Sequence, residues 1–258
     1  MNNRGWLKKQ LSLTFFLGLS LTLSGSLFSQ TSIAQNTAKA NQTRVVFKPP
    51  DRGKPKDTVG GASRDGGKCR EDSQEISPYL TAVIPAQHPG LTIQEHPKIL
   101  VYLPNISAEK AFFSLRELSS DGYNQQEHYQ TILSLPQASG IITVELPKDA
   151  PKLEIGKIYK WSFVVMCNNQ LRPDSPVVEG TIERIALNSP LSEQLQKALG
   201  LERVALYGQA GLWYDAISSL AQLRQNEPKN LELVTIWQDL LNSQMVELNA
   251  IANQPLIQ

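Results

Sequence analysis

Residues 151–167 read P-K-L-E-I-G-K-I-Y-K-W-S-F-V-V-M-C, and this stretch predicts the fold more clearly than any other part of the chain. From residue 159 to 167 the alternation of side chains favours a β-strand. One face of this strand carries Tyr159, Trp161, Phe163, Val165 and Cys167. We expect this aromatic and apolar face to point into a protein core.

The residues just before the strand have the spacing of a tyrosine corner, with Leu153, Gly156 and Tyr159 in the three positions. In such a corner a leucine covers the core, a glycine makes a tight turn, and the tyrosine hydroxyl bonds back to the backbone of the turn. This pattern is typical of the sixth strand of an immunoglobulin-like or fibronectin-type sandwich. The alternative is that Gly156 is an ordinary turn glycine without a corner.

Seven short segments between residues 79 and 187 have strand character, with prolines between them. They are residues 80–84, 98–103, 111–118, 127–135, 140–146, 157–167 and 177–185. Asp121 and Gly122 give a hairpin signal between the third and fourth segments. Proline is typical of such connections because it cannot donate to a strand ladder. The pattern predicts an all-β sandwich domain over residues 79–187.

From residue 188 to 258 the apolar spacing becomes helical. Ser189 is the predicted N-cap of a first helix, with Pro190 at its first helical position and Gly200 at its end. The apolar face that begins at Trp213 predicts a third helix that ends before Pro228. The second and third helices resemble one tetratricopeptide repeat, through Tyr207, Gly211, Trp213, Ala216, Leu220, Leu223 and Pro228. The alternative is a helical hairpin that simply packs on the sandwich. The predicted fold class is α+β multidomain: an immunoglobulin-like or fibronectin-type sandwich followed by a small tetratricopeptide-like helical tail.

Residues 1–34 have the features of a secretory signal peptide. Arg4, Lys8 and Lys9 precede an apolar run, and small residues follow at Ser32 and Ala34. We expect export to the periplasm or beyond the cell, with no membrane span after cleavage; an uncleaved membrane anchor is the alternative. Residues 35–78 have the composition of a flexible, basic, Gly/Pro-rich arm.

The chain has 258 residues, 41% of them hydrophobic, and a formal net charge of +1. It is therefore long enough for one medium domain and one small one. Basic residues outnumber acidic ones in residues 35–69, and acidic ones outnumber basic ones in residues 70–258. This mildly acidic main part of the chain argues against a dedicated nucleic-acid-binding protein, which needs clustered basic residues to contact phosphates.

The two cysteines are Cys69 and Cys167. In an exported chain we expect them to form a disulfide. The bridge would fasten the arm to the aromatic strand and would stabilise the fold by about 4 kcal/mol, because it closes a long loop. Two separate buried thiols are the alternative.

Several segments together resemble an uncharacterised family of exported cyanobacterial proteins, the domain of unknown function 928. They are Arg52-Gly53-x-Pro55, residues 60–64 with Cys69, residues 80–85, Val101-Tyr102-Leu103-Pro104, residues 153–163 with Cys167, and residues 205–216. Residues 166–169 read Met-Cys-Asn-Asn and depart from the Cys-Asp-Pro expected there. The loop after the sixth strand is therefore less similar to the family than the other segments are. The resemblance implies export and a two-part layout, and it implies no activity.

The reactive side chains of the sequence form no familiar catalytic or metal-binding motif. His88, His96 and His128 lack a second histidine or a cysteine at zinc-ligand spacing. A Ser-His-Asp triad can assemble from distant positions, but the chain has no Gly-x-Ser-x-Gly motif. We therefore predict no catalytic residue, no cofactor and no metal site.

The leading hypothesis is an exported, non-catalytic binding or scaffolding protein whose helical tail presents a face to a protein partner. Candidate interaction residues are Tyr207, Trp213, Tyr214 and Asp215. A carbohydrate-binding sandwich is the second hypothesis, with Tyr102, Tyr123, Tyr129 and Trp161 as possible stacking faces. A secreted hydrolase of unrecognised type is the third. The oligomeric state stays open.

Overall fold

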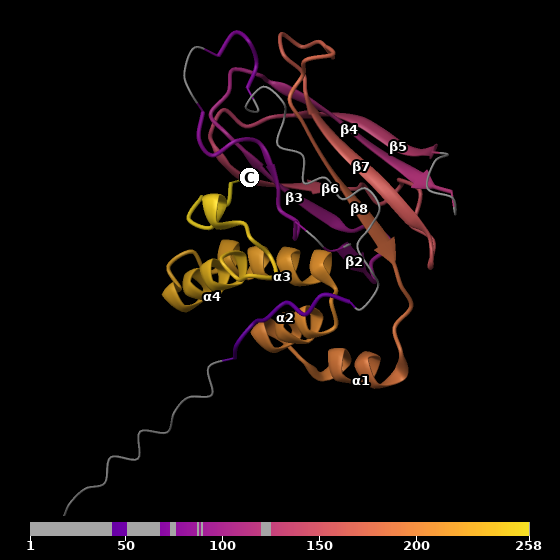
Figure 1. The fold of residues 1–258 in the computed structure, drawn as a ribbon. Coiled ribbons are helices and arrows are strands. Elements are labelled where there is room, and N and C mark those ends of the chain that lie inside the picture. The colour runs from indigo at the N-terminus through magenta and orange to yellow at the C-terminus, as the bar shows by residue number, and fades with distance from the viewer. Residues whose placement is uncertain are drawn as a thin grey trace, which may run out of the picture. The chain divides into compact units, whose positions relative to one another are not determined.

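A computed structural model of the chain describes residues 43–50, 68–72, 76–86, 88, 90–119 and 125–257 (Figure 1). The predicted signal peptide at residues 1–34 lies outside the described residues. The hairpin signal at residues 121–122 and most of the predicted arm at residues 35–78 lie outside them too.

The described residues contain eight strands in two sheets. The strands are β1 (Thr81–Ala82), β2 (Gly90–Thr92), β3 (Lys98–Leu103), β4 (Lys110–Leu118), β5 (Gln125–Ser134), β6 (Gly140–Glu145), β7 (Ile158–Val165) and β8 (Val177–Arg184). The smaller sheet has the order β1-β3-β6 and is antiparallel. The larger sheet has the order β2-β8-β7-β4-β5, and its β2–β8 pair is parallel.

The aromatic strand predicted from the sequence is β7, which lies between β8 and β4 in the larger sheet. Its residues alternate between buried and partly exposed, as expected for a strand with one face on a core. Tyr159, Trp161 and Phe163 are completely buried. Each apolar side chain buried in this way stabilises the fold by roughly 1.5–3 kcal/mol.

Four helices follow the strands: α1 (Ser189–Lys197), α2 (Gly200–Gln209), α3 (Trp213–Asn226) and α4 (Leu231–Leu241), with a short 3₁₀ helix η1 (Asn249–Ile251). The first begins one residue earlier than predicted, because the side chain of Asn188 caps it by accepting a hydrogen bond from the Leu191 N–H. Asn230 caps α4 in the same way. Gly200, expected to end the first helix, instead begins α2.

Helices and sheets share one hydrophobic core. Strand residues such as Trp161 and Phe163 belong to the same buried cluster as the helical residues Trp213, Leu220 and Trp237. Helix α3 contacts both β2 and β3 (Figure 1). Residues Asn41–Gln258 therefore form a single compact unit rather than two domains.

Residues 43–50 of the predicted arm pack on the helices (Figure 1). Phe47 is buried and meets the ring of Trp213 edge to face, with centroids 5.1 Å apart. The Lys48 N–H donates to the Gly208 carbonyl at 2.9 Å. A Cβ on Gly208 would lie 2.6 Å from the Val46 carbonyl oxygen, so this close approach requires glycine.

The predicted fold class is wrong in its arrangement, although two sheets followed by helices are present. A multidomain chain with an antiparallel immunoglobulin-like or fibronectin-type sandwich would carry its tetratricopeptide-like tail apart from the sandwich. Instead α3 packs on the sheets, and no second helical repeat for it to stack on occurs in the described residues. The parallel strand β2 was not predicted, because three residues are too few to show periodicity.

No helix in the described part of the chain combines the length and the hydrophobicity needed to cross a bilayer.

Candidate functional site

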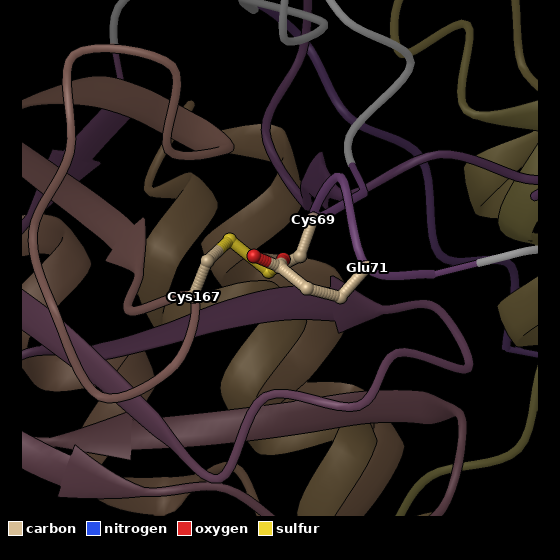
Figure 2. Close-up of side chains that lie close together, drawn as sticks. All are labelled: Cys69, Glu71 and Cys167. Atoms are coloured by element: carbon tan, nitrogen blue, oxygen red, sulfur yellow. A yellow bond between two sulfur atoms is a disulfide. The ribbon is translucent and has the colours of Figure 1, made fainter.

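The predicted disulfide between Cys69 and Cys167 is present (Figure 2). The two Cα atoms lie 5.6 Å apart, and the residues are separated by 98 positions in the sequence. The bond joins the arm to the end of the β7 segment. Both cysteines are buried, so the bridge is shielded from solvent.

The Glu71 carboxylate lies beside the disulfide, and these three residues place possible metal-ligand atoms within 4.8 Å of one another (Figure 2). Each sulfur, however, is bonded to the other sulfur rather than present as a thiolate ligand. Glu71 accepts hydrogen bonds from Asn168 Nδ2 at 2.7 Å and Arg172 Nη1 at 2.8 Å. Backbone hydrogen bonding and the Arg172 guanidinium lower the pKa of the Glu71 carboxyl. The cluster therefore fastens the arm and is not a metal centre.

Asp72 adds a second attachment for the arm. Its two carboxylate oxygens accept hydrogen bonds from the backbone N–H groups of Cys69 and Ser107, each at 2.9 Å. Arg70 forms an ion pair with Asp174 at 2.6 Å. Because such exposed pairs contribute little individually, the disulfide carries most of the attachment.

The corner residues Leu153, Gly156 and Tyr159 lie together before β7. The Tyr159 hydroxyl accepts a hydrogen bond from the Glu154 N–H at 3.0 Å, and Leu153 is completely buried. Gly156 has φ of +83°, a left-handed conformation that favours glycine. The hydroxyl thus bonds back to the turn that precedes its own strand.

The four candidate interaction residues, Tyr207, Trp213, Tyr214 and Asp215, are all buried. Trp213 donates its indole N–H to the Val83 carbonyl at 2.8 Å. Tyr214 accepts a hydrogen bond from the Trp161 indole at 2.7 Å and donates to the Thr181 carbonyl at 3.0 Å. Trp213 and Tyr214 thus join α3 to residues in or next to the strands, and all four side chains are covered, so a face for a partner has to be sought elsewhere.

Asp215 is a buried carboxylate in the first turn of α3. Its oxygens accept hydrogen bonds from the Ile93 N–H at 3.2 Å and from Gln94 Nε2 at 3.1 Å. Burial raises the pKa of Asp215 to about 6, although these hydrogen bonds act to lower it. The carboxylate borders a small polar pocket of about 190 Å³ that His96 and Lys98 also line. It ties the start of α3 to the residues after β2.

A larger groove of about 480 Å³ lies between the helices and the sheets. Most of its lining comes from three elements: the edge of β6, the end of β5 and the polar side of α3. The lining residues are Lys98, Leu133, Ser134, Pro136, Ile142, Thr143, Val144, Glu145, Ser218, Ala221, Gln222, Gln225, Asn226 and Ile257. Lys98 and Glu145 are paired at 2.6 Å, so the charged residues of the lining neutralise each other.

The C-terminal residues run beside β6 at one end of this groove. The Ile141 N–H donates to the Pro255 carbonyl at 2.7 Å, and the Ile257 N–H donates to the Ile141 carbonyl at 3.0 Å. This is a parallel β-bridge between Ile141 and Leu256. The free edge of β6 is therefore already used for strand pairing at Ile141.

The aromatic residues considered for sugar stacking do not form an exposed platform among the described residues. Trp161 and Tyr102 are buried in the core, and Tyr129 is partly buried. Tyr123 lies outside the described residues. Among the residues that the structure describes, no aromatic side chain lines the groove between β6 and α3.

Sequence reasoning did not find the groove. Its residues come from segments far apart in the chain and carry no catalytic or ligand motif. One usable signal was the run of neutral amides on α3, at Gln222, Gln225 and Asn226. The edge position of β6 gave no such signal, because it depends on the pairing of distant strands.

No curated protein matches the chain. One solved structure that is similar is that of Astrotactin-2, described as a conserved vertebrate-specific and perforin-like membrane protein involved in neuronal development. Its identity is 14% and its TM-score 0.27, and the match covers 76% of this chain and 42% of that chain. This chain therefore spans less than half of that protein, and no functional conclusion follows.

Residues 59–256 match one protein family over most of the described fold, including the disulfide, the corner, β6 and α3. The chain belongs to the family described as Domain of Unknown Function (DUF928).

Proposed function

We propose that this protein is an exported, non-catalytic binding protein that holds a partner protein in the groove between β6 and α3. The observation that carries the proposal is the groove itself, which combines an open strand edge with a helix face rich in amide side chains. Backbone groups and amides of this kind are suited to binding another polypeptide.

Export is supported by the disulfide and by the composition of residues 1–34. Stable disulfides form in oxidising compartments such as the periplasm. Basic residues followed by an apolar run and small residues are typical of a signal peptide.

The charge of the groove favours a protein over a polyanion. Lys98 is paired with Glu145, and the other lining residues are uncharged. A nucleic-acid site would need several unpaired basic residues to meet phosphates. An uncharged polypeptide matches this lining better.

The walls of the groove are held firmly. Helix α3 is attached to the sheets by Trp213, Tyr214 and Asp215. A surface that is ordered before binding loses less conformational entropy when the partner arrives. The buried residues first expected to contact a partner thus support the surface instead of forming it.

In-cell photo-crosslinking of the exported protein tests the proposal. A photoreactive residue is placed at Gln222 or Asn226, both exposed in the groove, and at Gln196 as a matched control, an exposed glutamine on α1. We expect the same partner to be captured from Gln222 and Asn226 and not from Gln196.

A groove-filling variant makes the test specific. Gln225→Trp places a large ring in the groove, and we expect it to abolish crosslinking from Gln222 without changing the thermal unfolding midpoint. Equal capture from Gln196, or capture that survives Gln225→Trp in a folded protein, would count against groove binding.

A further inference from the structure

Along β6 the backbone N–H and C=O groups of successive residues point alternately towards β3 and towards the open edge of the sheet. The groups of Ile141 point towards the edge, because its N–H and C=O bond to Pro255 and Ile257 rather than to β3. By the same alternation, Thr143 and Glu145 present their backbone groups to the edge.

A hydrogen bond on the far side of β3 supports this register. Leu100 is opposite Thr143, and its carbonyl accepts a hydrogen bond from the Val83 N–H at 3.0 Å. That carbonyl therefore points towards β1 and away from β6. Thr143 and Leu100 are thus a non-hydrogen-bonded pair, which leaves the Thr143 backbone groups directed outward.

Within the described part of the chain, no hydrogen bond reaches the edge-facing N–H or C=O of Thr143 or Glu145. Both residues line the groove, as do Gln222, Gln225 and Asn226 of α3. An open strand edge of this kind is a template for a further strand.

We propose that the partner binds as an added β-strand along β6, through an extended segment without net charge that pairs with the backbone of Thr143 and Glu145. This inference rests on the proposed function and specifies the binding mode. The segment 255–257 shows that the edge accepts a strand at Ile141, and the site continues that pairing along the same strand. The amides on α3 supply hydrogen bonds to the polar groups of the segment.

The lining also determines what the segment looks like. An extended peptide points alternate side chains to opposite sides. The groove lining offers amide side chains on α3 and apolar residues such as Leu133 and Pro136. Alternating polar and β-branched residues therefore fit the site, and acidic or basic runs do not.

A displayed library of random peptides of about ten residues, the usual upper length of a strand, is the probe for this site. The wild-type protein is compared with Thr143→Pro, which lacks the edge N–H, and with Thr143→Val, which keeps it. Proline is tolerated there because this N–H takes no part in the β3 ladder. Glu145→Pro removes the second edge N–H and serves if Thr143→Pro does not fold.

We expect enrichment of uncharged, β-branched sequences that bind wild type and Thr143→Val equally and bind the folded proline variant at least tenfold more weakly. Hydrogen exchange of the Thr143 and Glu145 amides should slow at least tenfold when the best enriched peptide is added. Failure to enrich any peptide, enrichment of charged sequences, or equal binding to a folded proline variant would overturn strand addition.

The two proposals fail separately. If crosslinking from Gln222 is specific but the proline variants still capture the partner, groove binding stands and strand addition is wrong. If crosslinking is not specific for the groove, the proposed function is wrong as well.

Discussion

The indole N–H of Trp161 on β7 donates a 2.7 Å hydrogen bond to the hydroxyl of Tyr214 on α3. The Tyr214 hydroxyl in turn donates to the Thr181 carbonyl on β8 at 3.0 Å. Both rings are buried, and no solvent reaches this chain of hydrogen bonds. It joins the helical region to the larger sheet, and it explains why the two behave as one unit.

Removing the Tyr214 hydroxyl should destabilise the protein. In Tyr214→Phe the indole N–H of Trp161 stays buried without an acceptor, and such a group costs about 1–3 kcal/mol. Urea unfolding at neutral pH measures the loss. Tyr79→Phe is the control, because Tyr79 is exposed and should change stability by less than about 0.5 kcal/mol. Equal stability of the two variants would contradict the importance of the hydrogen bond.

Gly180 provides the space that the Trp161 ring occupies. A Cβ at this position would lie 2.6 Å from Trp161 Cε2, so Gly180→Ala should cost about 1–3 kcal/mol through overpacking. In a Trp161→Phe background the smaller ring leaves room, and the same substitution should cost less. Denaturant unfolding of the four proteins gives the coupling between the two sites. Additive effects would show that the ring is not what restricts this position.

The disulfide should account for a large part of the stability. Replacing Cys69 and Cys167 together with serine should lower the free energy of unfolding by about 4 kcal/mol, because the bond closes a loop spanning 98 positions. Adding a reductant should bring the wild type to the level of the variant and leave the variant unchanged. An unfolding midpoint of the wild type that does not change when the reductant is added would contradict this role.

Asp215 should make stability depend on pH between about 4 and 6. Burial raises its pKa from an ordinary 3.8 to about 6, so the folded state binds this proton more tightly than the unfolded state does. The stabilisation is fully present below about pH 4 and is lost as the pH rises through about 6; the total is about 3 kcal/mol.

Asp215→Asn isolates this effect because the variant cannot titrate at this position. Its stability relative to the wild type should therefore increase by up to about 3 kcal/mol between pH 4 and pH 7. His96 and Lys98 line the adjoining pocket and are present in both proteins, so the comparison isolates the substitution at Asp215. A difference that stays constant across this range would show that Asp215 titrates normally.

Local patterns predicted most of the individual elements. The alternation around Trp161 predicted β7 and the side that faces the core. Helix α3 was predicted from Trp213 to the residues before Pro228, and it spans Trp213–Asn226. These features depend on neighbours within a few residues, which is the range over which a sequence pattern carries information.

The arrangement of the elements was not predictable in the same way. Burial of Tyr214 depends on Gly90 and Gly180, which leave room for the two rings and lie far from it in the sequence. Its hydroxyl partner, Trp161, is 53 positions away. The tetratricopeptide-like pattern therefore suggested interaction residues that are in fact buried, because a repeat pattern does not show what covers each face of a helix.

The groove was missed for a related reason. Thr143 is unremarkable in the sequence, and its edge position depends on β6 having a partner on one side alone. The α3 amides that line the same groove lie about eighty positions later, a separation at which no sequence period links residues. Long-range pairing creates the site, so the site becomes visible only in three dimensions.

The decisive measurement is a structure of the protein joined to a partner identified by the crosslinking experiment. We predict that the partner lies along α3 and β6, in contact with Gln222 and with the backbone of Thr143. A partner seated on another face, with this groove open to solvent, would contradict groove binding.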